Sequence, residues 1–421
     1  MSKRRCTFAL CAGLLAAFLV WRSARAADWP QFRGPNHDGV SAEDGGLEKW
    51  PDQGPKVLWK ANVGQGYSGI AISGGRLFTM GHRKPGAASS VAEEVDQVCC
   101  LDAATGAEVW KHSYLCPVGS YYGPFTTPAV DAGLVISLSQ FGQLHCFEQS
   151  SGKVLWHQNL VDDLHGKKPY YGYACSPLIV GDVAVFEAGG PEASLVALDK
   201  HTGRLAWQYG KGEAGYSSAV SCKLDGKSCV VALTPAAAFG VDAVTGQEMW
   251  RHSWKAPPQS SATAPLVCGQ RVFVSASNEK KTGILLEVAG GKASVVWQNQ
   301  NMMNYFNASV LHNGHLYGIH SLDHISKNST LRCLDLQTAE VKWEKAGVGL
   351  GGLILAGTRL LILSEAGELL VAEATPEAYK ELGRAKVLDG SCWNAPVLCE
   401  GRIYCRNHRG DIVCLVLRDA R

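Results

Sequence analysis

The sequence predicts an all-β protein, an eight-bladed β-propeller of four-stranded antiparallel blades. Two observations carry this prediction: a recurring motif of an acidic residue, a small turn pair and a tryptophan, and the short strands that recur around each copy. Six copies place their tryptophans 43 to 51 residues apart, at Trp110, Trp156, Trp207, Trp250, Trp297 and Trp343. A period of that size is typical of solenoids and propellers, whose units bury their faces only against neighbouring units.

Each copy of the motif has a local structural explanation. An apolar strand leads into the acid, as at Asp102, Asp199, Asp242 and Asp335. The carboxylate can accept hydrogen bonds from backbone amides in the turn, and glycine supplies the positive φ that such turns need. The next strand ends on tryptophan, whose large ring can fill the gap between adjacent units. We therefore interpret acid, turn and tryptophan as structural.

Four short antiparallel strands recur in each unit of about 45 residues, which describes a propeller blade. The first strands of the eight units begin near Ser68, Phe125, Ala174, Tyr216, Ala262, Phe306, Leu350 and Trp393. The seventh unit departs from the pattern, because Glu373-Ala-Thr-Pro376 replaces the turn and no tryptophan follows.

The last unit lacks a fourth strand, and the missing piece lies at the other end of the chain. Residues 57–63, which include Trp59, resemble a fourth strand without an acid turn before it. We expect this N-terminal strand to pair with the C-terminal blade. Such pairing closes the ring and removes its open edges.

The domain organisation predicted from the sequence has four parts. Residues 1–26 read as a secretory signal, with a basic start, an apolar run and a small-x-small cleavage site at Ala24-Arg25-Ala26. Residues 27–56, rich in Gly, Pro and Asp, fit neither strand nor helix and are expected to cross one face as a strap. Residues 57–417 form the propeller and 418–421 a tail. The apolar run is too short for a lasting membrane anchor, so we expect a periplasmic or secreted protein cleaved near Ala26.

The net charge argues against one class of ligand, and several cysteines have a structural explanation. Lys and Arg number 40 against 38 Asp and Glu, without a basic stripe, which argues against nucleic-acid binding. Thirteen of the 15 cysteines follow the signal. Several stand two residues before the acid, as Cys100 and Cys146 do, where a small buried residue fits. Cys222 and Cys229 flank a two-residue Asp-Gly turn and are predicted to form a disulfide.

A ligand site is expected where the first strands line the central axis. The residues in that column are small and hydrogen-bonding: Ser68, Thr126, Cys175, Ser217, Thr263, Asn307, Gly351 and Asn394. Aromatic residues cluster just upstream: Tyr67, Tyr121, Tyr122, Phe125, Tyr170, Tyr171, Tyr173, Tyr216, Tyr305, Phe306 and Trp393. A funnel rimmed by tyrosine suits a flat ring, a sugar or a peptide. The alternative is structural: crowding at the axis selects small residues, and the aromatic rings pack between blades.

Metal binding is not predicted at the axis. Asn307 and Asn394 could supply oxygens to a hard cation, but Ca²⁺ prefers six or more oxygens including carboxylates, and the column has none. Four histidines, His312, His315, His320 and His324, suggest zinc or copper as an alternative. His312 and His315 flank an Asn-Gly turn, where exposed histidines are common without a metal.

The repeat resembles that of a known protein family. The acid, Thr-Gly and Trp pattern resembles the pyrroloquinoline-quinone (PQQ)-like β-propeller repeat, found in quinoprotein alcohol dehydrogenases and in the propeller subunit of the outer-membrane barrel-assembly machinery. The opening Asp28-Trp-Pro-Gln-Phe-Arg-Gly-Pro-Asn36 is similar to the start of exported PQQ-like propellers of planctomycete-type bacteria. The resemblance covers roughly residues 28–417. It implies the fold, while one propeller fold hosts unrelated functions.

The resemblance to quinoproteins implies PQQ on the axis, between an aromatic floor and a vicinal disulfide, with Ca²⁺ held by carboxylate and amide oxygens. The pair Cys99-Cys100 lies instead in a third strand just before Asp102, where alternate side chains point to opposite faces. We interpret this pair as structural. The assembly-machinery subunit is usually a lipoprotein, and no lipid-acceptor cysteine follows the signal in this chain.

These observations favour a non-catalytic binding platform, a monomer that contacts a protein, peptide or glycan at its axial face. The alternative from another class is a PQQ-dependent alcohol or sugar oxidoreductase that uses the same funnel, with PQQ and Ca²⁺ as its cofactors. A planar base stacked on Trp393 near a carboxylate–calcium site would favour the enzyme. A third hypothesis is a metal-handling protein built around the histidines of the sixth unit.

Overall fold

The computed structural model describes residues 28–44, 46–47, 50–51, 54–85, 93–117, 119, 121, 123–253, 262–277, 282–323 and 326–417. The predicted signal and tail, together with Tyr122 and His324, lie outside these residues. Apart from one 3₁₀ turn, Ser326–Asn328, the regular structure in the described part is β-strand. No helix in it is long and apolar enough to cross a membrane.

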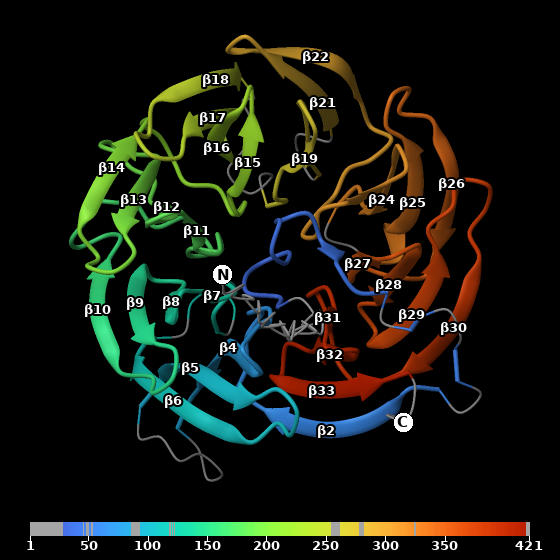
Figure 1. The fold of residues 1–421 in the computed structure, drawn as a ribbon, viewed down its shortest axis with the longest axis horizontal. Coiled ribbons are helices and arrows are strands. Elements are labelled where there is room, and N and C mark those ends of the chain that lie inside the picture. The colour runs from blue at the N-terminus through green and yellow to red at the C-terminus, as the bar shows by residue number, and fades with distance from the viewer. Residues whose placement is uncertain are drawn as a thin grey trace, which may run out of the picture.

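The described strands form eight sheets arranged as blades around one axis (Figure 1). Blade 1 consists of β3 (Ala71–Ser73), β4 (Arg76–Arg83), β5 (Val95–Asp102) and β6 (Glu108–Leu115), and blade 2 of β7 (Ala129–Asp131), β8 (Leu134–Leu138), β9 (Gln143–Glu148) and β10 (Val154–Asn159). Blade 3 consists of β11 (Leu178–Val180), β12 (Val183–Glu187), β13 (Leu195–Asp199) and β14 (Leu205–Tyr209), and blade 4 of β15 (Val220–Leu224), β16 (Lys227–Leu233), β17 (Ala237–Asp242) and β18 (Glu248–Ser253).

Blades 5 to 8 complete the circle. Blade 5 consists of β19 (Leu266–Cys268), β20 (Arg271–Ala276), β21 (Thr282–Ala289) and β22 (Lys292–Asn299), and blade 6 of β23 (Val310–His312), β24 (His315–His320), β25 (Thr330–Asp335) and β26 (Val341–Ala346). Blade 7 consists of β27 (Gly352–Ala356), β28 (Arg359–Leu363), β29 (Glu368–Glu373) and β30 (Glu381–Lys386). Blade 8 consists of β31 (Val397–Cys399), β32 (Arg402–Arg406) and β33 (Asp411–Val416), with β2 (Lys56–Asn62) as its outer strand. The predicted eight-bladed, all-β fold is therefore confirmed. The first strands begin two to four residues later than the sequence suggested, because the chain enters each blade through an extended loop.

Ring closure occurs as the sequence predicted. Strand β2 pairs antiparallel with β33, and Trp59 stands opposite Cys414. The N-terminal strand is thus the outer strand of the C-terminal blade, and in Figure 1 the blue β2 lies beside the red β33. This arrangement ties the two ends of the domain together without an open sheet edge between them.

The segment before β2 crosses the centre of the ring (Figure 1) and contacts the inner strands of several blades. Trp29 bridges Ile72 of blade 1, and the carbonyl of Pro30 accepts a hydrogen bond from Val130 of blade 2. Contrary to the expectation of no regular structure, this segment also contains the strand β1 (Val40–Ser41), which pairs in parallel with β27 of blade 7. The strand arises from pairing with an inner edge, which leaves no signal in the local sequence.

Arg33 anchors this segment. Arg33 is 9% exposed, and its guanidinium donates to the backbone carbonyls of His37, Asp38, Ala308 and Ser309 over 2.7–3.1 Å. Burial lowers the pKa of Arg33 to about 10, which still leaves the group charged at neutral pH. A planar cation with five donors can bind several carbonyls at once, so Arg33 holds the segment against blade 6.

The motif tryptophans pack between neighbouring blades. The Nε1 of Trp59 donates to the carbonyl of Ala103 at 3.1 Å, and a Cβ on Gly106 would lie 2.6 Å from the Trp59 ring. Each turn is held by its acid, as when Oδ1 of Asp102 accepts the N–H and the hydroxyl of Thr105. The small residue two positions before the acid faces the tryptophan, as Cys100 faces Trp110.

Blade 7, which lacks its own motif tryptophan, receives one from elsewhere. Gly383 occupies the tryptophan position of this blade, opposite Val371. A Cβ on Gly383 would overlap the indole ring of Trp50, a residue of the N-terminal segment. Trp50 packs on the core cluster that includes Leu369, Val371 and Leu415. The N-terminal segment therefore supplies the ring that the local sequence of blade 7 omits.

The thirteen cysteines after the predicted signal are free thiols in this structure. Cys222 stands directly opposite Cys229 across the β15–β16 hairpin, as the two-residue turn predicted. The register therefore suits a cross-strand bridge, and the disulfide itself stays a prediction.

Candidate ligand-binding face

The two faces of the propeller differ in what they carry. Because the strands of a blade alternate in direction, the turns after the first and third strands lie at one face, here called the turn face. The loops that lead into the first strands lie at the opposite face, here called the loop face. The predicted site residues precede the first strands and therefore belong to the loop face.

A chain of aromatic rings follows the loop face around the axis. Tyr67 of the loop before blade 1 stacks on Trp393 with ring centroids 5.0 Å apart, and on Phe125 at 5.5 Å. Further contacts extend the chain at both ends. We define the aromatic belt as the residues linked by these ring contacts: Tyr67, Tyr121, Phe125, Tyr171, Tyr216, Phe306 and Trp393, with Tyr170 and Tyr305 at its margins.

The belt combines buried anchors with exposed rings. Tyr216 is 8% exposed, and its hydroxyl accepts the N–H of Tyr171 at 3.2 Å. Tyr121 is 43% exposed and Tyr170 is 71% exposed. Burial, and then the neighbouring Tyr121, raise the pKa of Tyr67, so its hydroxyl is neutral at physiological pH. Such rings present an apolar surface with neutral hydrogen-bonding tips.

The predicted column of small residues lies beneath the belt and is mostly buried. Ser68, Thr126 and Ser217 have no exposed surface, and Cys175 and Thr263 are at most 3% exposed. Their polar groups bond within the ring of blades: Thr126 Oγ1 donates to the carbonyl of Leu138, and Ser217 Oγ to that of Thr263. These side chains therefore hold neighbouring loops together, which leaves the belt as the part of the predicted site that can meet a ligand.

Tyr173 also lies apart from the belt. This residue is completely buried, and its hydroxyl donates to the carbonyl of Ala188 at 2.8 Å. Its ring belongs to the core between blades 2 and 3. The remaining predicted aromatic residues in the described part do face one another at the loop face, with the contacts given above.

Glu365 is a site residue that the sequence reading missed. It belongs to the loop between β28 and β29, and its Oε1 accepts the indole N–H of Trp393 at 3.0 Å while Oε2 accepts the N–H of Leu350 at 2.9 Å. Asn307 donates to the carbonyls of Gly351 and Trp393. A loop glutamate outside the repeat motif has no distinguishing local pattern, so only the packing of blades 7 and 8 reveals it.

Arg406 supports the belt from below, where blade 8 meets blade 1. The side chain is 1% exposed and donates to the carbonyl of Ser68 at 2.6 Å and to Thr79 Oγ1 at 2.5 Å. Asn394 also donates to the carbonyl of Ser68. These bonds fix the loop that carries Tyr67, so the belt rests on a rigid base at the point of ring closure.

The resemblance to quinoproteins implies a site for PQQ and Ca²⁺ on the axis, and the residues around Trp393 do not fit such a site. A stacked cofactor needs an open face of the indole, whereas Tyr67 stacks on Trp393 with planes 17° apart and Phe306 packs beside it. Glu365, the carboxylate that contacts Trp393 within the described residues, already accepts hydrogen bonds at both of its oxygens. The adjacent cysteines lie in β5, within blade 1, where burial raises the pKa of Cys99 to about 11 and of Cys100 to about 12.

The histidines of blade 6 do not converge. His312 and His315 face each other across the turn. His320 lies at the other end of β24, five residues or about 16 Å from His315, given 3.3 Å per residue. Burial lowers the pKa of His320 to about 4, and its Nδ1 accepts the N–H of Met303. Within the described residues no group of three or more His, Cys, Asp and Glu side chains could hold a metal ion.

Comparison with known protein families agrees with the repeat analysis. The family described as outer membrane protein assembly factor BamB matches residues 120–345, more than half of the chain. A BamB of Burkholderia pseudomallei (strain K96243) is 28% identical over 170 residues, which cover 40% of this chain and 38% of that protein. The match thus spans well under two thirds of the relative's length.

Solved structures resemble the whole propeller at low sequence identity. The quinohemoprotein alcohol dehydrogenase from Comamonas testosteroni has a TM-score of 0.68 at 14% identity, over 95% of this chain and 82% of that one. BamB from Moraxella catarrhalis has a TM-score of 0.62 at 13% identity, over 86% of this chain and 99% of that one. At these identities the likeness establishes the fold alone.

Proposed function

The chain belongs to the family of the outer membrane protein assembly factor BamB, and we propose that it acts as an exported binding platform. In this proposal the aromatic belt of the loop face contacts an extended segment of a partner polypeptide. The protein works in the periplasm or an equivalent compartment after removal of residues 1–26. It holds its partner without transforming it.

The observation that supports this proposal most directly is the belt itself. Monomeric proteins seldom expose clustered tyrosines without a use, and tyrosine and tryptophan are enriched where proteins bind one another. Tyr121 and Tyr170 are exposed, while Tyr67 and Trp393 are held by stacking and by hydrogen bonds beneath them. Rigid aromatic anchors contribute contact area at little cost in side-chain entropy.

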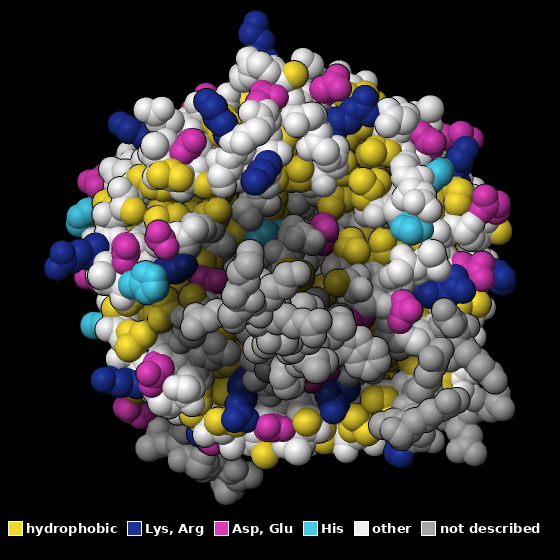
Figure 2. All heavy atoms as spheres, in the orientation of Figure 1, with side chains coloured by type: hydrophobic (Ala, Val, Ile, Leu, Met, Phe, Trp, Pro, Cys, Tyr) yellow, Lys and Arg dark blue, Asp and Glu magenta, His cyan; other side chains and the backbone are white. Residues whose placement is uncertain are grey.

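The charge distribution is compatible with a neutral partner segment. Figure 2 shows the turn face, where Lys, Arg, Asp and Glu side chains of both signs are interspersed around the rim, while the belt lies on the opposite face. The belt residues are uncharged, and Glu365 is engaged by Trp393 and Leu350. A segment with aromatic or aliphatic side chains and free backbone hydrogen-bonding groups would suit such a surface better than a strongly charged one.

Site-specific photocrosslinking tests the proposal in cells that produce the protein. A benzophenone amino acid replaces Tyr170, which is 71% exposed at the belt, and in a separate variant it replaces Leu205, which is 48% exposed on the outer strand of blade 3. We expect discrete protease-sensitive adducts from position 170 and their loss when Tyr67→Ala and Tyr121→Ser are added. Equal adducts from both positions, or adducts resistant to protease, would contradict a polypeptide partner at the belt.

A further inference from the structure

The junctions between blades follow one rule in most of the ring. The indole N–H of the outer-strand tryptophan donates to the carbonyl of the residue that follows the acidic position of the next blade, or its equivalent. These bonds join Trp59 to Ala103, Trp110 to Gln149, Trp156 to Lys200, Trp207 to Ala243, Trp297 to Leu336 and Trp343 to Thr375, at 2.8–3.2 Å. In four of these junctions the ring also covers the glycine of the next turn.

Trp250, between blades 4 and 5, breaks this rule. It is 2% exposed, whereas Trp59, Trp110, Trp156 and Trp207 are each 8% exposed. Among the described residues its Nε1 bonds to no carbonyl of blade 5 and lies instead beside the thiol of Cys229 in its own blade. The indole ring therefore packs against its own blade, blade 4, and does not bond to the described part of blade 5.

Gly240 accounts for the position of the Trp250 ring. This residue stands opposite Trp250, in the column that holds cysteine in blades 1, 2, 6 and 8, alanine in blade 3, leucine in blade 5 and valine in blade 7. A Cβ on Gly240 would overlap the indole nitrogen of Trp250 and would lie 2.8 Å from Sγ of Cys229. The missing methyl group thus makes room for the ring inside blade 4.

Blade 5 has also lost the tight turn that receives the ring elsewhere. Glu287 occupies the acid position, but the strands continue to a two-residue turn at Gly290 and Gly291. Val288 keeps the backbone bond that its counterparts make, from its N–H to the carbonyl of Gln270 at 2.9 Å. The nearest atom to a Cβ on Gly291 would be the carbonyl of Met249 at 3.3 Å, not an indole.

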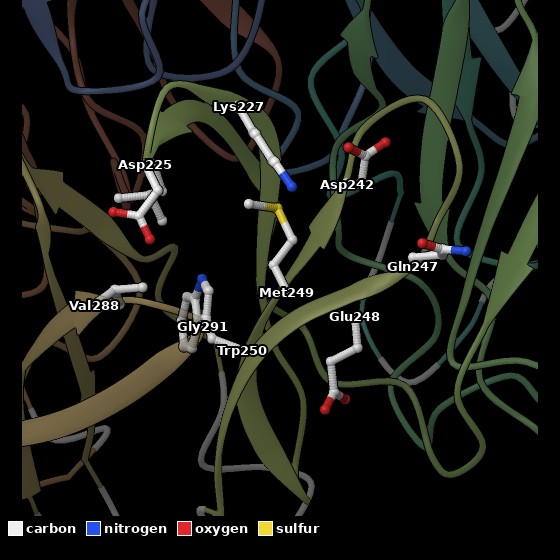
Figure 3. Close-up of a pocket in the computed structure, with 10 residues that line it drawn as sticks. Asp225, Lys227, Asp242, Gln247, Glu248, Met249, Trp250, Val288 and Gly291 are labelled. Atoms are coloured by element: carbon white, nitrogen blue, oxygen red, sulfur yellow. The ribbon is translucent and has the colours of Figure 1, made fainter.

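A cavity of about 270 Å³ lies where the ring would otherwise dock (Figure 3). Blade 4 contributes Asp225, Met249 and Trp250 to its lining, and blade 5 contributes Val288 and Gly291. The cavity belongs to the turn face and outer rim, since its lining comes from the β15–β16, β17–β18 and β21–β22 turns and from β18. It is therefore separate from the aromatic belt of the loop face.

The junction between blades 7 and 8 shows that a tryptophan from another segment can occupy such a place. There the indole of Trp50, more than 300 residues away in the chain, covers Gly383. The outer strand of a blade without its own ring thus accepts an indole supplied by a separate stretch of polypeptide.

We propose that the cavity between blades 4 and 5 binds the indole side chain of a tryptophan in a partner polypeptide. The ring enters between Met249 and Val288, in the place that motif tryptophans occupy at other junctions. Three carboxylates, of Asp225, Asp242 and Glu248, and one ammonium, of Lys227, line the cavity. Glu248 is already paired with Arg251 at 2.8 Å, which leaves a surplus of one negative charge. This surplus favours a segment with lysine or arginine beside the tryptophan and disfavours an acidic one.

Fluorine NMR with a fluorinated indole tests the site in the full mature chain. The probes are N-acetyl-5-fluorotryptophanamide and the capped peptide Gly-Lys-(5-fluoroTrp)-Lys-Gly. The first test variant is Gly240→Ala, whose methyl group displaces Trp250 from blade 4 and into the cavity. The matched control is Cys146→Ala, which places alanine at the same position of the repeat in blade 2, opposite Trp156.

We expect wild type and Cys146→Ala to bind the peptide saturably with equal affinity, and Gly240→Ala to bind it at least tenfold more weakly. Met249→Trp, which fills the cavity from the outer strand, should weaken binding equally and serves if Gly240→Ala does not fold. Unchanged affinity in both cavity variants, or no saturation by wild type at millimolar peptide, would overturn the site. Tighter binding of the single amino-acid amide than of the peptide would overturn the assignment to a polypeptide. Variants of Tyr67 and Tyr121 should leave this binding unchanged, which separates it from the belt.

Discussion

The indole of Trp393 and the phenol of Tyr67 stack with centroids 5.0 Å apart and planes 17° apart, and this contact joins the last blade to the first at the loop face. The two residues are 326 positions apart in the chain. Their contact depends on ring closure by β2 and on Arg406, which fixes the carbonyl of Ser68 next to Tyr67. The aromatic belt is thus a product of the closed ring and not of any one blade.

The stacking of Tyr67 on Trp393 gives a prediction about quinone binding. Titration of the mature protein with PQQ, with and without Ca²⁺, should change neither the quinone absorbance nor the melting temperature. The reason is that the Trp393 ring is already engaged, since Tyr67 stacks on it and Phe306 packs with its centroid 4.9 Å away. A saturable, calcium-dependent rise in melting temperature would contradict this prediction and support the dehydrogenase hypothesis.

Gly106 should be intolerant of a side chain because the Trp59 ring lies against it. Gly106→Ala places a Cβ 2.6 Å from that ring at a backbone φ of 74°, and we expect the free energy of unfolding to fall by about 2–4 kcal/mol. Urea unfolding measures the loss. Gly133→Ala is the matched control, since its φ is 83° but no atom lies within 4 Å of the added Cβ. Equal losses in both variants would show that the ring contact contributes nothing.

Arg33 should control attachment of the N-terminal segment. Arg33→Met removes the donors to four buried carbonyls, so we expect cleavage by chymotrypsin near Phe32 to become at least tenfold faster. Arg33→Lys should be intermediate, because an ammonium cannot span the same carbonyls. Limited proteolysis followed by mass spectrometry gives the rates. Cleavage at the wild-type rate in Arg33→Met would mean that other contacts hold the segment.

Glu187 should make stability fall as the pH rises. Burial raises the pKa of Glu187 from 4.5 to about 8, partly offset by the N–H of Gly215, which donates to Oε2 at 2.9 Å. The folded state therefore holds a proton that the unfolded state releases. The resulting stability is fully present below pH 4.5 and is lost as the pH rises to about 8.

Glu187→Gln should remove this dependence, with a difference from wild type of about 2–5 kcal/mol between pH 4.5 and 8. Urea unfolding at several pH values measures it. Comparing the two proteins at each pH cancels the contribution of buried histidines such as His145, whose pKa burial lowers to about 4. Parallel pH profiles of the two proteins would rule out a protonated Glu187.

Cys222 and Cys229 should form a disulfide in an oxidising compartment such as the periplasm, where we propose that the protein works. Their positions are paired across a two-residue turn, so their side chains share one face of the hairpin. Mass spectrometry of a non-reduced digest should recover the linked peptides from protein purified from the periplasm. Recovery of both as alkylated free thiols under non-reducing conditions would contradict the prediction.

The repeat made the architecture predictable from sequence. Acid, turn and tryptophan recur with a period that only stacked blades explain, and the strand at 57–63 matched the piece missing from the last blade. The same logic failed for β1, because Val40 and Ser41 become a strand only through pairing with Leu355 and Ala356. It also missed Trp50 and Glu365, whose partners lie in other blades and outside any motif.

The number of blades, their strand order and the closure of the ring follow from the amino-acid sequence alone, since these depend on local periodicity and on turns whose residues are neighbours in the chain. How each junction is filled depends on packing in the folded ring. Gly240 lets Trp250 withdraw, Trp50 fills the place over Gly383, and Tyr67 meets Trp393. The physical reason is that a side chain's choice between two packing sites depends on the volume left by residues far away in sequence, which no local pattern records.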